Sequence, residues 1–343
     1  MINGIPRILI IRLSAIGDVV RVLPALQALR DRYPNAQIDW AIERKSAEVI
    51  LDHPALDQCL VFERSAGWLK GSGEFRAFCK RIRDGRYDVV LDFHGIMKSG
   101  LITRASKAPK RYGFRRPRAQ EFSYFFTNQR VALPFDRMNR IEENLELCKV
   151  LDAINPRLDA VIYIPDEVQD EVDEYLAQTF DSGKRLVVLH APIDRPEKQW
   201  PLESYAALAD LLLADGRFEV VLTWGPGQRH LAEQVQELSR RKPVIAPGLP
   251  SLKHYAGLVY HAALYVGGDT GPMHIASIMG TPVVAIFGGT DPARHAPLRR
   301  PSEALYAGPD PFPKSMDLAT AQKCLEAITP DIAYDASIRV SCS

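Results

Sequence analysis

Short strand-like runs alternate with helical stretches along almost the whole chain, and this alternation is what most limits the possible folds. The runs RILII at Arg7–Ile11 and DVVLDF at Asp88–Phe93 are typical of strands buried in a parallel sheet. Between them the pattern predicts a helix over Val19–Tyr33, a strand over Ile38–Ile42, a helix over Ser46–Leu51, a strand over Cys59–Phe62 and a helix over Gly73–Asp84.

The same alternation restarts after residue 165. It predicts strands at Arg185–His190, Glu219–Thr223, Val244–Ala246, Leu264–Gly267 and Pro282–Phe287, and helices at Leu202–Ala214, Arg229–Arg240 and Pro272–Met279. A length of 343 residues also favours two domains over one. We therefore expect two doubly wound α/β domains, at 1–165 and 183–330, a linker helix within 166–182, and a C-terminal tail at 331–343.

The composition excludes several classes of protein. Hydrophobic residues make up 46% and charged residues 25% of the chain, as in ordinary globular proteins, so disordered and collagen-like chains are excluded. No apolar run approaches the roughly 20 residues of a membrane span, and the N-terminal pattern is not that of a signal peptide. The five cysteines are scattered and form no CxxC pair, so we expect free thiols, no zinc site and a cytoplasmic location.

The charge is distributed unevenly between the two halves. Residues 1–165 contain 27 Lys and Arg against 19 Asp and Glu, a balance of +8, whereas the remainder contains 16 against 23, a balance of −7. A basic domain joined to an acidic one indicates a large anionic partner for the first domain. The charge alone does not distinguish nucleic acid from anionic lipid.

A candidate anion site follows a predicted strand in the second half, in the segment YVGGDTGPMH at Tyr265–His274. Thr270 is placed to cap the following helix, and Pro272 fits its first turn. Free N–H groups and the helix dipole at such a terminus favour a phosphate or diphosphate. The alternative is an ordinary capped helix without a ligand, in which His274 is only a packed side chain.

Two further loops support a ligand at this edge of the sheet. FGGTDP at Phe287–Pro292 and WGPG at Trp224–Gly227 both follow predicted strands, and they bring Thr290 and Trp224 to the same side. The dinucleotide fingerprint GxGxxG is absent after the first strand, and no Walker loop occurs. A nicotinamide cofactor is therefore disfavoured.

The first half has a carboxylate and a basic segment of its own. Asp18, in the loop Ser14–Asp18, either favours the dipole of its helix or acts as a general base toward an alcohol. Residues 93–120 contain eight Lys and Arg and no acid, together with Tyr112 and Phe114. Such a run is a solvated face, a site for several phosphates or carboxylates, or a nucleic-acid patch, although no nucleic-acid recognition motif accompanies it.

At these residues the chain resembles the bacterial lipopolysaccharide heptosyltransferases, glycosyltransferase family 9. The matching motifs run from about residue 7 to residue 330: ILIIRLSAIGDVVRVLPAL, DFHGIMKSG, NRIEENLEL, EKQWPLESYAAL, GGDTGPMHIAS and FGGTDPARHAPL. The resemblance implies a GT-B fold, with two Rossmann-like domains facing each other across a cleft. It also implies inverting, metal-independent transfer of heptose from an ADP-activated donor to a lipid-linked acceptor, without a cofactor.

The resemblance also assigns roles to particular residues. The family's base falls on Asp18 and its donor-phosphate lysine on Lys198, while the DTGxxH signature matches Asp269, Thr270, Gly271 and His274. Further donor-binding residues are expected at Trp224, Gly227, Gln228 and Thr290. The acceptor-facing basic residues correspond to Arg64, Lys98, Arg111, Arg115, Arg116 and Arg118.

One departure from the family's pattern concerns the nucleotide. The loop that usually carries an acidic residue for the adenosine ribose has Gly227 and Gln228 instead, and a glutamine binds a hydroxyl more weakly than a carboxylate does. The identity of the donor sugar and base is therefore open. The alternatives are another sugar nucleotide or acceptor, a nucleotide-sugar epimerase of the same fold, or a non-catalytic sugar-nucleotide module.

The resemblance also implies partners and a location. The basic half is expected to bind an anionic, lipid-linked oligosaccharide built on Kdo and lipid A, and no nucleic acid is expected. We expect a cytoplasmic protein in peripheral contact with the inner membrane. An amphipathic patch for that contact is expected at Trp68–Leu69 or at Phe122–Phe126, and the alternative is that these aromatic residues belong to the core.

Overall fold

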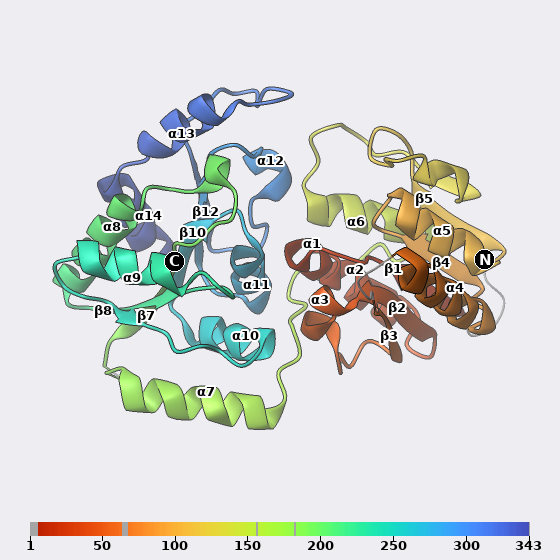
Figure 1. The fold of residues 1–343 in the computed structure, drawn as a ribbon, viewed down its shortest axis with the longest axis horizontal. Coiled ribbons are helices and arrows are strands. Elements are labelled where there is room, and N and C mark those ends of the chain that lie inside the picture. Colours follow the sequence, from red (N-terminus) through yellow and green to blue (C-terminus); the bar gives the residue numbers. More distant parts are fainter. Residues whose placement is uncertain (1–5, 64–67, 156, 182, 343) are drawn as a thin grey trace. The chain divides into compact units, whose positions relative to one another are not determined.

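A computed structural model describes residues 6–63, 68–155, 157–181 and 183–342. By their contacts the residues divide into two compact units, Met1–Tyr163 and Ile164–Ser343. Each unit is built around one six-stranded sheet with helices packed on it (Figure 1).

The sheet of the first unit is entirely parallel, with the strand order β3-β2-β1-β4-β5-β6. Its strands are β1 (Arg7–Ile11), β2 (Gln37–Glu43), β3 (Gln58–Phe62), β4 (Val89–Asp92), β5 (Lys110–Phe114) and β6 (Gln129–Val131). Ile8–Ile11 are completely buried, because β1 lies between two other strands and helices cover both faces of the sheet. β5 and β6 lie outside the predicted strands, because one is rich in charge and the other has only three residues.

Helices form in the three segments of the first unit where the sequence predicts them, although one of these is divided, and two further helices, at Met97–Ala105 and Arg140–Cys148, lie outside the prediction. They are α1 (Ile16–Val20), α2 (Leu23–Arg32), α3 (Arg44–Ala47), α4 (Trp68–Asp84), α5 (Met97–Ala105) and α6 (Arg140–Cys148), with 3₁₀ turns η1 (Glu48–Ile50), η2 (Ser123–Phe125) and η3 (Lys149–Leu151). The prediction of one helix over Val19–Tyr33 is wrong, because the chain breaks between Val20 and Leu23. Pro24 lies in the first turn of α2 and has no N–H to donate to the carbonyl of Val20.

The second unit repeats the same topology. Its parallel sheet has the order β12-β11-β10-β7-β8-β9, which is the order of the first sheet when its strands are counted along the chain. The strands are β7 (Arg185–His190), β8 (Phe218–Thr223), β9 (Val244–Ile245), β10 (Leu264–Gly268), β11 (Val283–Phe287) and β12 (Ser302–Tyr306). The predicted α/β architecture of two Rossmann-like units is confirmed.

The helices of the second unit include the stretch predicted as a linker and the C-terminal segment. They are α7 (Asp166–Thr179), α8 (Leu202–Asp215), α9 (Arg229–Leu238), α10 (Leu252–His261), α11 (Gly271–Met279), α12 (Pro292–His295), α13 (Leu318–Glu326) and α14 (Pro330–Ser341), with the turn η4 (Pro196–Lys198). α7 packs against α10, where buried Val172 contacts Gly257, and α14 packs against α8 and β11.

The strand order determines where each unit can bind a ligand. In both sheets the chain first adds strands on one side of the first strand and then crosses to its other side, between β1 and β4 and between β7 and β10. We call this position the switch point of the sheet. Open α/β sheets bind ligands at such points, outside the carboxyl ends of the strands. The residues after Ile11 and Asp92, and after His190 and Gly268, are therefore the places to look for a site.

Candidate active site

In the second unit, a buried ion pair lies at this point of the sheet. Lys198, at the end of η4, donates from Nζ to Asp269 Oδ2 at 2.7 Å and to the Asp269 carbonyl at 3.1 Å. Asp269 directly follows β10 and is only 5% exposed. On its other side, His274 Nε2 lies 3.3 Å from Asp269 Oδ1. The carboxylate is thus held between a lysine and a histidine that lie far apart in sequence from each other.

These contacts determine the charge of Asp269. Burial acts to raise its pKa, but the hydrogen bond and charge of His274 and the charge of Lys198 outweigh this, so the pKa lies well below its usual range. Asp269 is therefore ionised at neutral pH. It holds the ammonium group of Lys198 in position. The Lys198 side chain is 14% exposed.

Glycines allow the loop of Lys198 to approach the strand ends. A Cβ on Gly268 would lie 2.4 Å from Ile193 Cδ1 and 3.2 Å from the Lys198 carbonyl. A Cβ on Gly288 would lie 2.7 Å from the Glu197 carbonyl, to which Gly289 also donates its N–H at 2.7 Å. The glycine-rich loops after β10 and β11 therefore serve to seat η4 against the sheet.

The start of α11 retains groups suited to an anion. Thr270 occupies the N-cap position, as predicted, but its side chain makes no capping hydrogen bond and donates instead to the Gly268 carbonyl at 3.3 Å. The first N–H groups of α11, beginning at Gly271, are therefore not satisfied by that side chain. Thr290 Oγ1 is buried without a hydrogen-bond partner among the described residues, which is unusual unless a ligand or water supplies one.

The loop after β8, which is predicted to bind the nucleotide, has a carboxylate beside it although its own motif contains none. Gly227 has a φ of +78°, a left-handed conformation that suits glycine, and a Cβ there would meet no atom within 4 Å. Gln228 donates from Nε2 to Oδ1 of Asp194, which is exposed in the loop after β7. A carboxylate therefore does lie beside this loop, but it comes from a segment 34 residues away. Trp224 packs over Gly248 and donates to the Ala246 carbonyl at 2.9 Å.

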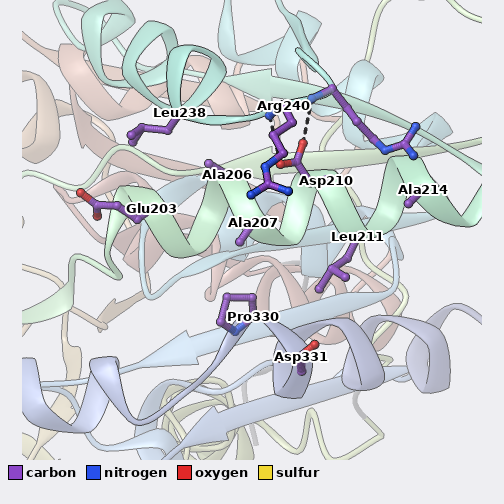
Figure 2. Close-up of a pocket in the computed structure, with 11 residues that line it drawn as sticks. Glu203, Ala206, Ala207, Asp210, Leu211, Ala214, Leu238, Arg240, Pro330 and Asp331 are labelled. Atoms are coloured by element: carbon purple, nitrogen blue, oxygen red, sulfur yellow. Dashed lines mark hydrogen bonds between the residues drawn. The ribbon is translucent and has the colours of Figure 1, made fainter.

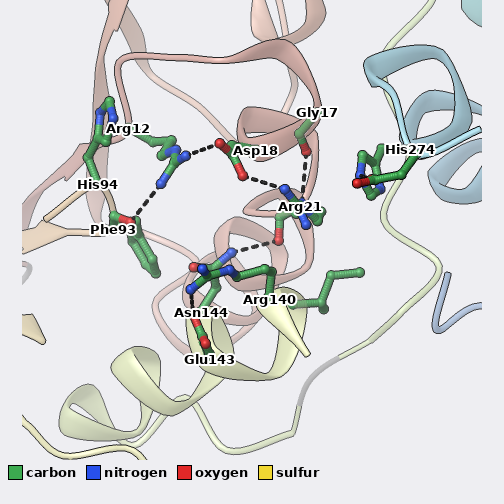
Figure 3. A network of polar contacts seen from close by, with 12 residues as sticks. Arg12, Gly17, Asp18, Arg21, Phe93, His94, Arg140, Glu143, Asn144 and His274 are labelled. Atoms are coloured by element: carbon green, nitrogen blue, oxygen red, sulfur yellow. Dashed lines mark hydrogen bonds and ion pairs between the residues drawn. The ribbon is translucent and has the colours of Figure 1, made fainter. Parts of the chain in front are cut away.

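In the first unit, a carboxylate paired with two arginines lies at the corresponding point. Asp18, in the first turn of α1, forms ion pairs with Arg12 and Arg21 through its two different oxygens (Figure 3). Both arginines are 7% exposed, whereas the Asp18 side chain is 34% exposed. The carboxylate is therefore held from the protein side and remains open to solvent on the other side.

Each arginine is also fixed to the backbone. Arg12 directly follows β1 and donates to the Phe93 carbonyl at 3.1 Å, and Arg21 donates from Nε to the Gly17 carbonyl at 3.3 Å. Burial lowers the pKa of Arg12 to about 10, an effect that Asp18 opposes and neighbouring arginines reinforce. Arg12 is therefore still charged at neutral pH.

A histidine completes this edge. His94 follows β4 and accepts the N–H of Leu13 through Nδ1 at 3.2 Å. Burial, and then the charge of Arg12, lower its pKa to about 3, so it is neutral at physiological pH. Sequence reasoning did not single out Arg12, Arg21, His94 or Asp194. Arg12 and Arg21 could have been found from the sequence, because they lie six and three residues from Asp18 within the same motif.

Comparisons with known proteins identify the family of the chain. The family model "Glycosyltransferase family 9 (heptosyltransferase)" matches residues 75–322, more than two thirds of the chain. The chain belongs to glycosyltransferase family 9. It is 25% identical to the lipopolysaccharide core heptosyltransferase OpsX of Haemophilus influenzae over 84% of this chain and 80% of that one. It is 29% identical to lipopolysaccharide heptosyltransferase 1 of Escherichia coli over 83% of this chain and 89% of that one.

The fold of this glycosyltransferase is similar to that of a solved heptosyltransferase. The E. coli heptosyltransferase WaaC, in a structure with ADP-2-deoxy-2-fluoro heptose, superposes with a TM-score of 0.74 at 23% identity, covering 96% of this chain and 98% of that one. The fold is therefore of the GT-B type, as expected from the sequence.

The predicted acceptor residues of the glycosyltransferase have unequal surroundings. Arg64 lies outside the described residues. Lys98 pairs with Glu43 and lies 4.6 Å from the centre of the Phe62 ring. Arg115 and Arg116 are exposed, and they line a surface cavity of about 670 Å³.

The other two predicted acceptor arginines are turned inward. Arg118 donates to the completely buried carboxylate of Glu143 at 2.8 Å and to the carbonyls of Phe93 and His94. Arg111 donates to the carbonyls of Ala108 and Phe126. These guanidinium groups hold the first unit together, so the basic run at 93–120 is not one continuous binding face.

A second surface cavity, of about 770 Å³, runs along α8 in the second unit (Figure 2). Its walls include Glu203, Ala207, Leu238 and Pro330. Asp210, which also lines it, accepts the backbone N–H groups of Arg240 and Arg241. No predicted site residue lines it, and we assign it no role in catalysis.

The described ranges of the chain contain neither a cluster of metal ligands nor a helix that could span a membrane. No group of three or more His, Cys, Asp or Glu side chains there is arranged to hold a metal ion. Of the helices in those ranges, none has the length and apolar content needed to cross a bilayer.

Proposed function

We propose that this glycosyltransferase moves heptose from ADP-heptose to a Kdo- and phosphate-bearing inner-core lipopolysaccharide acceptor, in one inverting displacement that requires no metal ion. The observation that carries the proposal is the pair of functional groups at the two switch points. The first unit has a solvent-accessible carboxylate there, and the second has a fixed ammonium group beside a helix N-terminus. The relatives named above are lipopolysaccharide heptosyltransferases, and WaaC was solved with an ADP-heptose analogue.

The donor diphosphate is assigned to the second unit. A lysine ammonium group has three N–H donors, of which the described contacts with Asp269 use two. The third is left for a phosphate oxygen. The N–H groups at Thr270–Gly271 and the dipole of α11 add positive potential at the same edge of the sheet. His274 and Thr290 complete the proposed donor site.

These groups also give the second unit its role in catalysis. When the bond from the sugar to the diphosphate breaks, the bonding electrons leave with the phosphate oxygen, and negative charge develops there. Lys198 and the start of α11 stabilise that charge in a partly buried site, where such interactions are stronger than in water. They supply the positive charge that a metal ion supplies in other transferases.

The adenosine is assigned to the loops after β7 and β8. In this proposal Asp194 takes the part of the acidic residue that is absent at Gly227, with Gln228 as a second hydrogen-bonding group for the ribose hydroxyls. Trp224 provides an apolar surface next to them.

Asp18 is assigned the part of general base. It accepts the proton of the acceptor hydroxyl while that oxygen attacks the sugar carbon on the face opposite the diphosphate. The flanking guanidinium groups hold the carboxylate in place through its two oxygens. An anionic acceptor that binds Arg12 or Arg21 would also free one carboxylate oxygen for the proton.

The acceptor is assigned to the basic first unit. Of the predicted arginines, Arg115 and Arg116 have exposed guanidinium groups suited to bidentate contacts with phosphates or carboxylates. Because such an acceptor is anchored in lipid, we also propose that the protein works on the cytoplasmic face of the inner membrane, in peripheral contact with it.

The direct test is to incubate the protein with ADP-heptose and Kdo-lipid A in the presence of EDTA and to measure the product mass. The proposal predicts a product heavier by one heptose. Transfer only after addition of a divalent metal would contradict metal independence. Binding of ADP-heptose without transfer would direct attention to a different acceptor, and no binding would contradict the donor.

A further inference from the structure

Three arginines and three aromatic rings form one surface on the first unit, which we name the aromatic–arginine patch. It consists of Arg115, Arg116, Phe122, Tyr124, Phe125 and Arg130. Four of these residues line the 670 Å³ surface cavity, together with Asn128 and Gln129. We infer that this patch docks on the surface of an anionic phospholipid bilayer, an inference that rests on the proposed peripheral membrane contact.

The apolar part of the patch points outward although its segment is firmly seated. Phe122 is 60% and Phe125 is 67% exposed, whereas Ser123 and Thr127 in the same segment are buried. Phe126 packs directly over Gly100 of α5, where a Cβ would lie 2.6 Å from its ring. The segment is therefore held on α5, and the exposure of its two other phenylalanines is not the result of a loose loop.

The rings form a continuous cluster. The Phe122 and Phe125 rings stack with a 15° angle between their planes and 6.3 Å between their centres, and the Tyr124 ring lies 4.6 Å from that of Phe125. Two exposed phenylalanines with a tyrosine behind them have the character of side chains that enter the headgroup region of a membrane.

The cations belong to the same surface. The guanidinium groups of Arg116 and Arg130 lie 5.7 and 5.9 Å from the centre of the Tyr124 ring. Among the described residues, Arg115, Arg116 and Arg130 form no ion pair. The acid next to the patch, Glu121, accepts the N–H of Met97 at the start of α5. The patch thus carries three positive charges without a paired acid, which suits lipid phosphates.

The lipid surface accounts for both parts of the patch. Phosphate groups alone explain the arginines but leave the exposed phenylalanines without a function. Single-stranded nucleic acid also combines phosphates with stacking, but Phe122 and Phe125 already stack on one another, which leaves fewer ring faces for bases. Binding of single-stranded RNA is therefore the competing outcome of the test.

The test measures sedimentation of the full chain with vesicles, without donor or acceptor. The wild-type protein is expected to bind vesicles of phosphatidylglycerol and phosphatidylethanolamine, to bind phosphatidylcholine vesicles weakly, and to lose affinity as salt is raised. We expect the double variant Phe122→Ser, Phe125→Ser to bind about tenfold more weakly. Arg115→Ser with Arg116→Ser should weaken binding about 30-fold.

Two controls keep the inference open to disproof. Arg240→Ser with Arg241→Ser removes an equally adjacent, exposed pair from the second unit and should leave vesicle binding unchanged. Phe122→Leu with Phe125→Leu keeps the apolar surface and should restore most of the binding, while thermal unfolding of each variant reports on folding. If the wild type binds the vesicles and the serine variants bind them equally well, the inference about the patch is overturned but the proposed peripheral contact is not. No wild-type binding to any vesicle overturns the patch and the peripheral contact, and binding of a single-stranded RNA instead of vesicles does the same.

Discussion

Lys198 and Asp269 form the central contact of the second unit: the lysine Nζ donates to both the side chain and the backbone carbonyl of the aspartate, at 2.7 and 3.1 Å. They lie 71 residues apart in sequence and are brought together at the switch point beside β10. The contact holds the lysine at the carboxyl edge of the sheet, because the buried Asp269 carboxylate, whose pKa is lowered, is ionised and accepts from it.

Lys198→Ala is expected to lower kcat about 10²–10³-fold, because in the proposed mechanism it removes one group that stabilises charge on the leaving phosphate. Asp269→Asn should reduce kcat to a smaller extent, since the ammonium group remains but is no longer fixed. Initial rates at saturating donor and acceptor measure both. Lys184→Ala removes an exposed lysine that pairs with Glu219 and serves as the matched control. An unchanged kcat in Lys198→Ala would exclude this lysine from the chemical step.

Asp18→Asn should lower kcat about 10³-fold and leave the affinity for ADP nearly unchanged, because in the proposed mechanism Asp18 acts on the acceptor while the second unit binds the donor. Steady-state rates and calorimetric titration with ADP separate the two effects. Asp31→Asn changes an exposed aspartate on α2 that accepts a hydrogen bond from Gln27, and should have normal rates. Near-normal turnover of Asp18→Asn would remove Asp18 from the part of base.

Gly268→Ala should weaken ADP binding and lower the free energy of unfolding, because its Cβ would lie 2.4 Å from Ile193 Cδ1 and 3.2 Å from the Lys198 carbonyl. Titration with ADP and urea denaturation measure the two losses. The matched control is Gly73→Ala on α4, where no atom lies within 4 Å of the new Cβ, and where alanine should stabilise the helix by about 0.5–1 kcal/mol. Normal ADP affinity in Gly268→Ala would show that the seating of η4 does not matter for the donor.

His190 makes the stability depend on pH. Burial lowers its pKa to about 4, against a usual value near 6.5, so between these pH values the unfolded chain binds a proton that the folded chain does not. Stability therefore falls as the pH falls through this window, by about 2 kcal/mol at pH 5 for this one group. His190→Gln should show a smaller loss between pH 7.5 and pH 5 in urea denaturation, whereas the exposed control His230→Gln should follow the wild type. Parallel pH curves for wild type and His190→Gln would contradict this assignment.

Much of the fold follows from local patterns in the sequence. The run RILII predicts β1 with its observed bounds, because a strand buried on both faces needs continuous apolar residues. The break before α2 follows from Pro24, a local cause that the helical periodicity obscures. β5 and β6 carry charged residues in an edge region of the sheet, where burial does not impose an apolar pattern.

The site could be predicted only in part, because its contacts are not local. Asp18, Lys198 and Asp269 stand in motifs that can be read along the chain, but the pairing of Lys198 with Asp269 depends on the strand order. Arg118 is turned inward by Glu143, which lies 25 residues further along on α6, and no charge count reveals this. In the same way, Asp194 reaches Gln228 from the end of a neighbouring strand.

The most direct test of the proposed mechanism is the anomeric configuration of the sugar linkage that the wild-type enzyme forms, determined by NMR of the purified product. Attack by an acceptor oxygen activated at Asp18, on the face opposite the diphosphate, predicts a configuration inverted with respect to the donor. A retained configuration would contradict a single displacement and, with it, Asp18 as its general base.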